Sequence, residues 1–314
     1  MKEAKKNFII TIDNEEDNQW NQSEKSTTRN AEFLPRFQKL CDRFGFKPVY
    51  LTTYHMAQNP FFVEFASDAI RKGNCEVGMH LHAWCSPPDY QLPQNTKHRS
   101  YLIEYPLNIM EEKIKRLDDL LGETFGQKAF SHRSGRWALN QDYIDLLSKY
   151  GYICDCSVTP GVNWASSLGT TGIPGSDVSR SPAQPHMLTD SMMEVPVTIR
   201  NLHYFDAERV RSPKTLAKEA YHLIRGKQSW LRPSIASLGR MKQLVKTASL
   251  KSDYVMFMIH SSELMPGGSP YYKDENAIEH LYDVLEELFE YLSASFQGIT
   301  LEQYTKQKMS IKQK

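Results

Sequence analysis

The chain has 314 residues, of which 40% are apolar and 24% are charged, the composition of an ordinary globular protein. A chain of this length can bury a large core without disulfides or structural metals, so we expect any bound metal to be functional. The formal net charge of +1 argues against nucleic acid as a partner of the chain as a whole.

The sequence also bears on the cellular compartment. It has no run of about eighteen apolar residues, so we expect no integral membrane segment. The N-terminus lacks the long apolar region and small-residue cleavage site of a secretory signal. The five cysteines lack zinc-finger spacing, and Cys154 and Cys156 are too close for an ordinary disulfide. These features favour a cytoplasmic protein with reduced thiols.

Short apolar runs alternate with amphipathic ones along the chain, which is typical of β/α units and a parallel sheet. The expected strands are 8–12, 48–52, 76–80, 129–132, 152–154, 193–197, 255–259 and 298–301. The expected helices are 31–44, 61–71, 108–121, 140–149 and 277–292. Seven or eight strands with helices between them predict a distorted (β/α) barrel, and an open sheet is the alternative because periodicity cannot separate the two.

Two stretches do not fit this alternation. Residues 161–191 are rich in Gly, Ser, Thr and Pro and are expected to form a long loop, and loops of that length are usually functional or disordered. Residues 207–251 hold eleven Lys/Arg and two Glu/Asp, and we expect two helices inserted there before the seventh strand. The chain is therefore interpreted as one domain over 1–314 with a basic helical insertion. That charge suits a nucleotide- or lipid-linked substrate, and a solvated surface is the alternative.

Polar residues collect where the predicted strands end, and catalytic groups of β/α barrels occupy the C-terminal ends of strands. Asp13 and Glu15 follow the first strand, and an extended backbone projects them to the same side. His80 and His82 do the same at the third strand. Two imidazoles and a carboxylate are the ligands of many catalytic zinc centres. A solvated acidic turn and two core histidines are the alternatives.

Two further strand ends carry candidates for chemistry. His260 ends the seventh strand, where an imidazole suits proton transfer near neutral pH, or is a core histidine. The residues after it, 261–268, are expected to form a mobile rim loop. Arg133 and Arg136 follow the fourth strand beside Gly135, which permits close backbone approach. An arginine there would keep a neighbouring carboxylate ionised, or form a structural ion pair.

The order of these motifs resembles that of the polysaccharide deacetylases of the NodB-homology group, carbohydrate esterase family four, from Ile9 to about Tyr271. The segments HLHAW, RSGRW and HSSELMPGGSP resemble most closely the WalW-like branch. The resemblance implies a NodB-type barrel. It also implies a metal-dependent hydrolase that removes an N-acyl group, usually acetyl, from an amino sugar of a surface-glycan precursor or polysaccharide.

The resemblance also implies roles for single residues. Asp13 would be the catalytic base, Arg133 its partner and His260 the acid. In the family the second histidine ligand usually lies four residues after the first, where this chain has Trp84, so His82 is the substitute. The implied metal ligands are Glu15, His80 and His82, and the implied metal is Zn²⁺, with Co²⁺, Mn²⁺ or Ni²⁺ as alternatives. The implied contacts to the carbohydrate substrate are Trp84, Arg136, Trp137, Asp155, Trp164 and Met258.

Two other functions stay open at this point. One is a hydrolase of the same fold acting on a different C–N bond, in a cyclic amide or a formyl group. The other is a carbohydrate-binding relative without a metal. A stoichiometric metal would separate the binding protein from the hydrolases, and acetate release from N-acetylated sugars would separate the two hydrolases.

Overall fold

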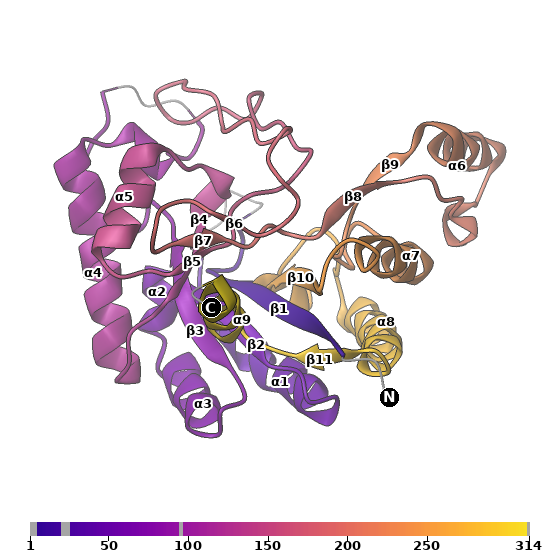
Figure 1. Ribbon diagram of the computed structural model, residues 1–314, viewed down its shortest axis with the longest axis horizontal. Coiled ribbons are helices and arrows are strands. Elements are labelled where there is room, and N and C mark those ends of the chain that lie inside the picture. Colours follow the sequence, from indigo (N-terminus) through magenta and orange to yellow (C-terminus); the bar gives the residue numbers. More distant parts are fainter. Residues whose placement is uncertain (1–4, 20–25, 94–96, 313–314) are drawn as a thin grey trace.

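A computed structural model describes residues 5–19, 26–93 and 97–312 and shows a curled α/β half-barrel (Figure 1). The strands of the main sheet run in the order β10-β1-β2-β3-β4-β5-β7-β6, and β11 pairs with β1 beside this path. Every neighbouring pair is parallel except β6 and β7. The bounds are β1 (Lys6–Asn14), β2 (Pro48–Thr52), β3 (Glu76–Leu81), β4 (Ser131–Ser134), β5 (Cys154–Asp155), β6 (His186–Met187), β7 (Met193–Glu194), β10 (Tyr254–His260) and β11 (Phe296–Gly298).

The outer face of the sheet is covered by helices (Figure 1). Their bounds are α1 (Leu34–Arg43), α2 (Tyr54–Ala57), α3 (Pro60–Arg71), α4 (Leu107–Phe125), α5 (Gln141–Lys149) and α8 (Glu275–Ser293). Asn59 and Asn140 cap α3 and α5 by accepting hydrogen bonds from the backbone N–H of Phe62 and Tyr143. Asparagine is among the residues most favoured at this position, so the caps help to fix where both helices begin.

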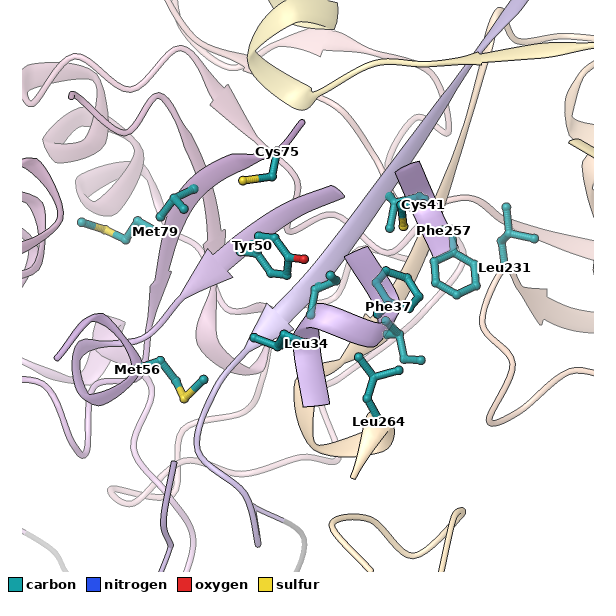
Figure 2. Close-up of a cluster of buried hydrophobic side chains, with 14 of the residues drawn as sticks. Leu34, Phe37, Cys41, Tyr50, Met56, Cys75, Met79, Leu231, Phe257 and Leu264 are labelled. Carbon is teal, nitrogen blue, oxygen red and sulfur yellow. The ribbon is translucent and has the colours of Figure 1, made fainter. Parts of the chain in front are cut away.

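The core has two parts because side chains alternate between the faces of a strand. Phe8, Ile10 and Ile12 of β1 belong to the outer cluster, which the helices cover, and Figure 2 shows part of it, with Phe37 and Phe257. Ile9 belongs to the inner cluster, inside the curl of the sheet. Both faces of β1 are therefore buried, which explains its unbroken apolar sequence.

The prediction of a distorted α/β barrel is confirmed, with the sheet open between β10 and β6. The strand expected at 298–301 is wrong in its bounds. The strand β11 ends at Gly298, and Leu301 already begins α9 (Leu301–Lys312). The helix was missed because it is mostly polar, so its few apolar residues give no clear period. Leu301 and Tyr304 pack into the inner cluster, so α9 covers the inner face of the sheet.

An arm, residues 199–230, extends from the main sheet (Figure 1). It consists of β8 (Ile199–Leu202), α6 (Pro213–Arg225) and β9 (Lys227–Trp230), and its two strands pair antiparallel. The helix α7 (Leu238–Ala248) follows it. Two helices were expected in the stretch 207–251. It also contains the strand β9, whose partner β8 lies before residue 207.

The stretch 161–191 contains turns, the short strand β6 and two isolated bridges, between Asn163 and Asp177 and between Leu168 and Pro174. Hydrogen bonds hold it in place: the backbone N–H groups of Thr170 and Thr171 donate to the carboxylate of Glu104. Among the helices of the described residues, none is long and apolar enough to cross a bilayer.

Candidate active site

A cleft of about 270 Å³ opens where β1, β3, β4 and β10 end. It is close to the lower limit for small-molecule sites, about 300 Å³. The residues that line it are Asp13, Glu15, Gln19, His80, His82, Trp84, His98, Arg99, Ser134, Arg136, Trp137 and His260. Most of the polar residues singled out at strand ends in the sequence therefore meet in one place.

The register of the sheet explains why they meet. In the parallel pairing of β1 with β10, Asp13 lies opposite His260. In the pairing of β3 with β4, His80 lies opposite Arg133. Residues that are far apart in the chain thus become neighbours because their strands end at the same level.

Three ligand atoms face one another beneath the cleft, and we call Glu15, His80 and His82 the donor triad. The Nε2 atoms of the two histidines are 3.0 Å apart, and Glu15 Oε2 lies 3.5 Å from His80 Nε2 and 3.1 Å from His82 Nε2. Ligands about 2.0–2.2 Å from a tetrahedral zinc ion are separated by about 3.3–3.6 Å. The donor triad therefore has nearly the spacing, and the N, N, O chemistry, that a divalent cation needs.

The neighbours of the two histidines orient them for this task. His80 Nδ1 lies 2.9 Å from the carbonyl oxygen of Arg133, which can only accept, so Nδ1 carries a proton and Nε2 of the neutral ring keeps its lone pair. Gly135 packs against His82 so closely that an added Cβ would lie 2.8 Å from the His82 ring. His82 Nδ1 lies 3.8 Å from the carboxylate of Glu16, which is beyond hydrogen-bond distance.

Asp13 forms a buried ion pair with Arg133, whose guanidinium also donates to Thr11 Oγ1 at 3.0 Å and to the carbonyl oxygen of Cys156 at 3.1 Å. Burial raises the pKa of Asp13, but the charge of Arg133, with smaller effects of His80 and His260, more than offsets this and leaves the pKa below its usual value. Asp13 is therefore a carboxylate at neutral pH, as a base must be.

Glu15 has the same balance. Burial raises its pKa, but the charge of His260 and the hydrogen bonds from His80 and His82 more than offset this and leave the pKa well below its ordinary value. The two carboxylates at the end of β1 are thus both ionised, one beside an arginine and one among three imidazoles. This division matches a base and a metal ligand.

His260 contacts both carboxylates and a further pair behind it. Its Nε2 lies 3.7 Å from Asp13 Oδ2 and 4.0 Å from Glu15 Oε1. Its Nδ1 lies 3.1 Å from Glu263 Oε2 and 2.9 Å from Arg232 Nη2. A carboxylate only accepts and a guanidinium only donates, so Glu263 and Arg232 favour opposite protonation states of Nδ1. Together they hold the imidazole ring in place.

We expect Glu263→Gln to lower the free energy of unfolding at neutral pH by about 3 kcal/mol. Burial raises the pKa of Glu263, but Arg232 and His260 lower it to about 2 overall. Because the pKa of Glu263 is lower in the folded than in the unfolded protein, its carboxylate stabilises the fold at every pH above the unfolded-state pKa, near 4.3. This stabilisation is lost as the pH falls toward the folded-state pKa. Urea unfolding of both proteins between neutral pH and pH ~3 should show the difference narrowing below pH ~4.3.

The matched control is Glu286→Gln. Glu286 pairs with Arg43 at the surface, where both side chains are about half exposed. Exposed pairs contribute little, so this variant should unfold like the wild type at every pH. A Glu263→Gln difference that stayed constant down to pH ~3 would show that its carboxylate charge is not what stabilises the fold.

The predicted aromatic and arginine residues lie on the rim. Trp84 stacks on His82, with ring centroids 4.3 Å apart. Arg136 donates to Ser167 Oγ and the carbonyl oxygen of Leu168, so it joins the rim to the stretch 161–191. Arg136 and Trp137 both have positive φ, 57° and 64°. Such strain outside glycine is typical of functional sites, and both residues line the cleft.

Three of the predicted substrate contacts do not line the cleft. Asp155 is buried and accepts from His132 Nδ1 at 2.6 Å and from the Ser157 hydroxyl. Met258 is buried in the inner cluster. Trp164 stacks on Trp137, with centroids 6.5 Å apart. Trp164 therefore packs against the rim, whereas Asp155 and Met258 belong to the interior of the protein.

Sequence reasoning missed several residues of the site. Gln19, His98 and Arg99 line the cleft but lie outside every segment singled out above. Ser134 also lines it and lies inside the RSGRW segment, where it was given no role. Glu16 directly follows Glu15, a signal that was available. A second group of metal-type ligands, in which Glu16 Oε1 lies 2.6 Å from His55 Nδ1 and 3.6 Å from Cys85 Sγ, adjoins the donor triad.

The fold is that of the polysaccharide deacetylases. A candidate polysaccharide deacetylase from Mycobacterium smegmatis superposes with a TM-score of 0.57 and 14% identity, covering 99% of this chain and 93% of that one. The 4-alpha-glucanotransferase of Thermococcus litoralis superposes with a TM-score of 0.53 and 12% identity, and this chain spans 38% of its length. No family model and no curated protein sequence matches the chain. These similarities define the fold, and the reaction must be argued from the site.

Proposed function

We propose that this protein is a metal-dependent hydrolase that removes an N-acyl group, acetyl in the first instance, from an amino sugar of a surface-glycan precursor or polysaccharide. One observation carries the proposal. The donor triad, with its ligand atoms 3.0–3.5 Å apart, lies in the same cleft as the ion-paired Asp13 and His260. A cation site, a base and an acid are the three parts that metal-assisted amide hydrolysis uses.

Each residue has a task in this reaction. When bound, a divalent cation polarises the acyl carbonyl and lowers the pKa of water. Asp13 takes a proton from the attacking water, and Arg133 keeps Asp13 ionised beforehand. His260 gives a proton to the departing amine, held in place by Glu263 and Arg232. We propose Zn²⁺ as the ion because two imidazoles and a carboxylate with an open position suit it, with Co²⁺, Mn²⁺ and Ni²⁺ as alternatives.

Cleavage of a glycosidic bond is less well supported by the same site. Such enzymes use two carboxyl groups, one of which is an acid with a raised pKa. Here the pKa values of both Asp13 and Glu15 are lowered, although burial alone would raise them. Neither is therefore suited to protonate a leaving sugar oxygen.

The first test is acetate release by the zinc-loaded protein from N-acetylglucosamine oligomers and from UDP-N-acetylglucosamine. We expect acetate and free amine in equal amounts, and a rate about 10²–10⁴-fold lower for His260→Gln, because the leaving amine loses its acid. New reducing ends without acetate would replace the proposal with glycoside cleavage. If the zinc-loaded protein released no acyl group from any N-acylated sugar, the proposed deacylase function would have no support.

A further inference from the structure

The helix α6 is inverted: it buries polar residues and exposes apolar ones. Its buried residues are Glu219 and His222. Four large apolar side chains of the same helix are exposed, by 47% to 74% of their surface: Leu216, Tyr221, Leu223 and Ile224. An ordinary surface helix has the opposite arrangement, with its apolar stripe toward the core.

Ion pairs lock α6 in this orientation. Glu219 Oε2 accepts from Arg240 Nη2 of α7 at 2.7 Å, and Glu219 Oε1 lies 3.2 Å from His222 Nδ1. Arg240 is itself buried and also contacts Asp206 at 3.3 Å. Turning α6 to bury its leucines would break the shorter of these two ion pairs of the buried Arg240, which is unfavourable. The apolar face is therefore held outward.

Basic residues border this face. At about 100° per residue, the apolar positions from Leu223 round to Tyr221 cover about 160° of the helix surface. Lys214, Arg225 and Lys218 follow next to Tyr221, and all three are exposed. The one acidic residue of α6 is the buried Glu219. An outward apolar face with a basic border is the pattern of helices that lie in the surface of a membrane.

We propose that α6 docks on the surface of an anionic lipid bilayer, with Leu216, Leu223 and Ile224 among the acyl chains and the basic border at the headgroups. The helix lies at the outer end of the arm, away from the main sheet, where a flat surface can reach it (Figure 1). The basic border favours a lipid surface over a second copy of the chain as the partner of this face. In a symmetric contact between two copies the same border would face itself, whereas phosphate headgroups complement it.

Docking would bring the cleft close to the bilayer. From α6, β9 leads back to the site, where Trp230 packs on Trp137 and Arg232 contacts His260. The chain between Arg225 and Arg232 can span at most about 25 Å. If the proposed deacylase function holds, this arrangement favours amino sugars carried on a membrane lipid. The docking itself does not depend on that function.

The test is flotation of the full chain with vesicles of phosphatidylcholine, alone or mixed with phosphatidylglycerol. We expect binding to the mixed vesicles, weakened by added salt. The Leu223→Glu/Ile224→Glu double variant should bind at least about tenfold more weakly. Lys214→Glu/Lys218→Glu should lose the preference for phosphatidylglycerol. The control is Leu250→Glu, at a leucine that is 80% exposed outside α6, and it should bind like the wild type.

Three outcomes would overturn the proposal. The wild type could fail to float with either vesicle, or the α6 variants could bind as well as the wild type. Light scattering could instead show a dimer that the Leu223→Glu/Ile224→Glu change separates, which would assign the face to a second copy of the chain. Circular dichroism of each variant checks its fold, so that lost binding is not mistaken for unfolding. None of these readouts requires deacylase activity.

Discussion

The purified protein should contain about one divalent cation per chain, and His82→Ala should bind zinc at least about 100-fold more weakly. The variant removes one of the three donor atoms that lie 3.0–3.5 Å apart, and neither Glu15 nor His80 can replace it. Elemental analysis of both proteins and a zinc titration against a competing chelator measure the difference. Acetate release should fall with metal content.

The matched control for this prediction is His98→Ala, which removes a histidine from the same cleft but not from the donor triad. It should keep the metal. A native protein that takes up no metal even from added zinc would refute the metal-dependent proposal. If His82→Ala kept its metal, the third ligand would be a residue other than His82. Glu16, whose carboxylate lies 3.8 Å from His82 Nδ1, would be the next candidate.

Much of this site follows from sequence because the fold has a simple rule. Polar residues at the ends of parallel strands come together at one edge, whatever their distance along the chain. Asp13 lies near the end of β1, His80 lies near the end of β3 and His260 ends β10, and the register of the sheet brings them into one cleft. The rule needs only the buried strands, which the apolar runs reveal.

The rest of the site depends on contacts that no local pattern encodes. The segment after His260 was expected to be a mobile loop, but residues 261–264 form a buried turn. Its Glu263 is ordered by Arg232, from just beyond the arm. A glutamate in a Gly- and Ser-rich stretch looks solvated until its distant partner is known. The inverted orientation of α6 could not be predicted from sequence either, because the spacing of its apolar residues does not show which face of the helix is buried.

The other large effect is expected for Asp13→Asn, which should slow acyl release by about 10²–10⁴-fold because an amide cannot take a proton from water. It should also lower the free energy of unfolding by about 3–5 kcal/mol, because it leaves Arg133 buried without an opposite charge. Rates at saturating zinc and urea unfolding of the same preparation measure the two effects.

The pH dependence separates the two roles of Asp13. The folded-state pKa is lowered, so its carboxylate stabilises the fold above the unfolded value, near 3.9, and this contribution disappears as pH falls through the folded value. The stability gap between wild type and Asp13→Asn should therefore close below pH ~4. Asp17→Asn is the control, a buried carboxylate that binds Thr27 rather than an arginine. A variant that loses stability but keeps its rate would make Asp13 the partner of Arg133 and no more, and the base would have to be sought elsewhere in the cleft.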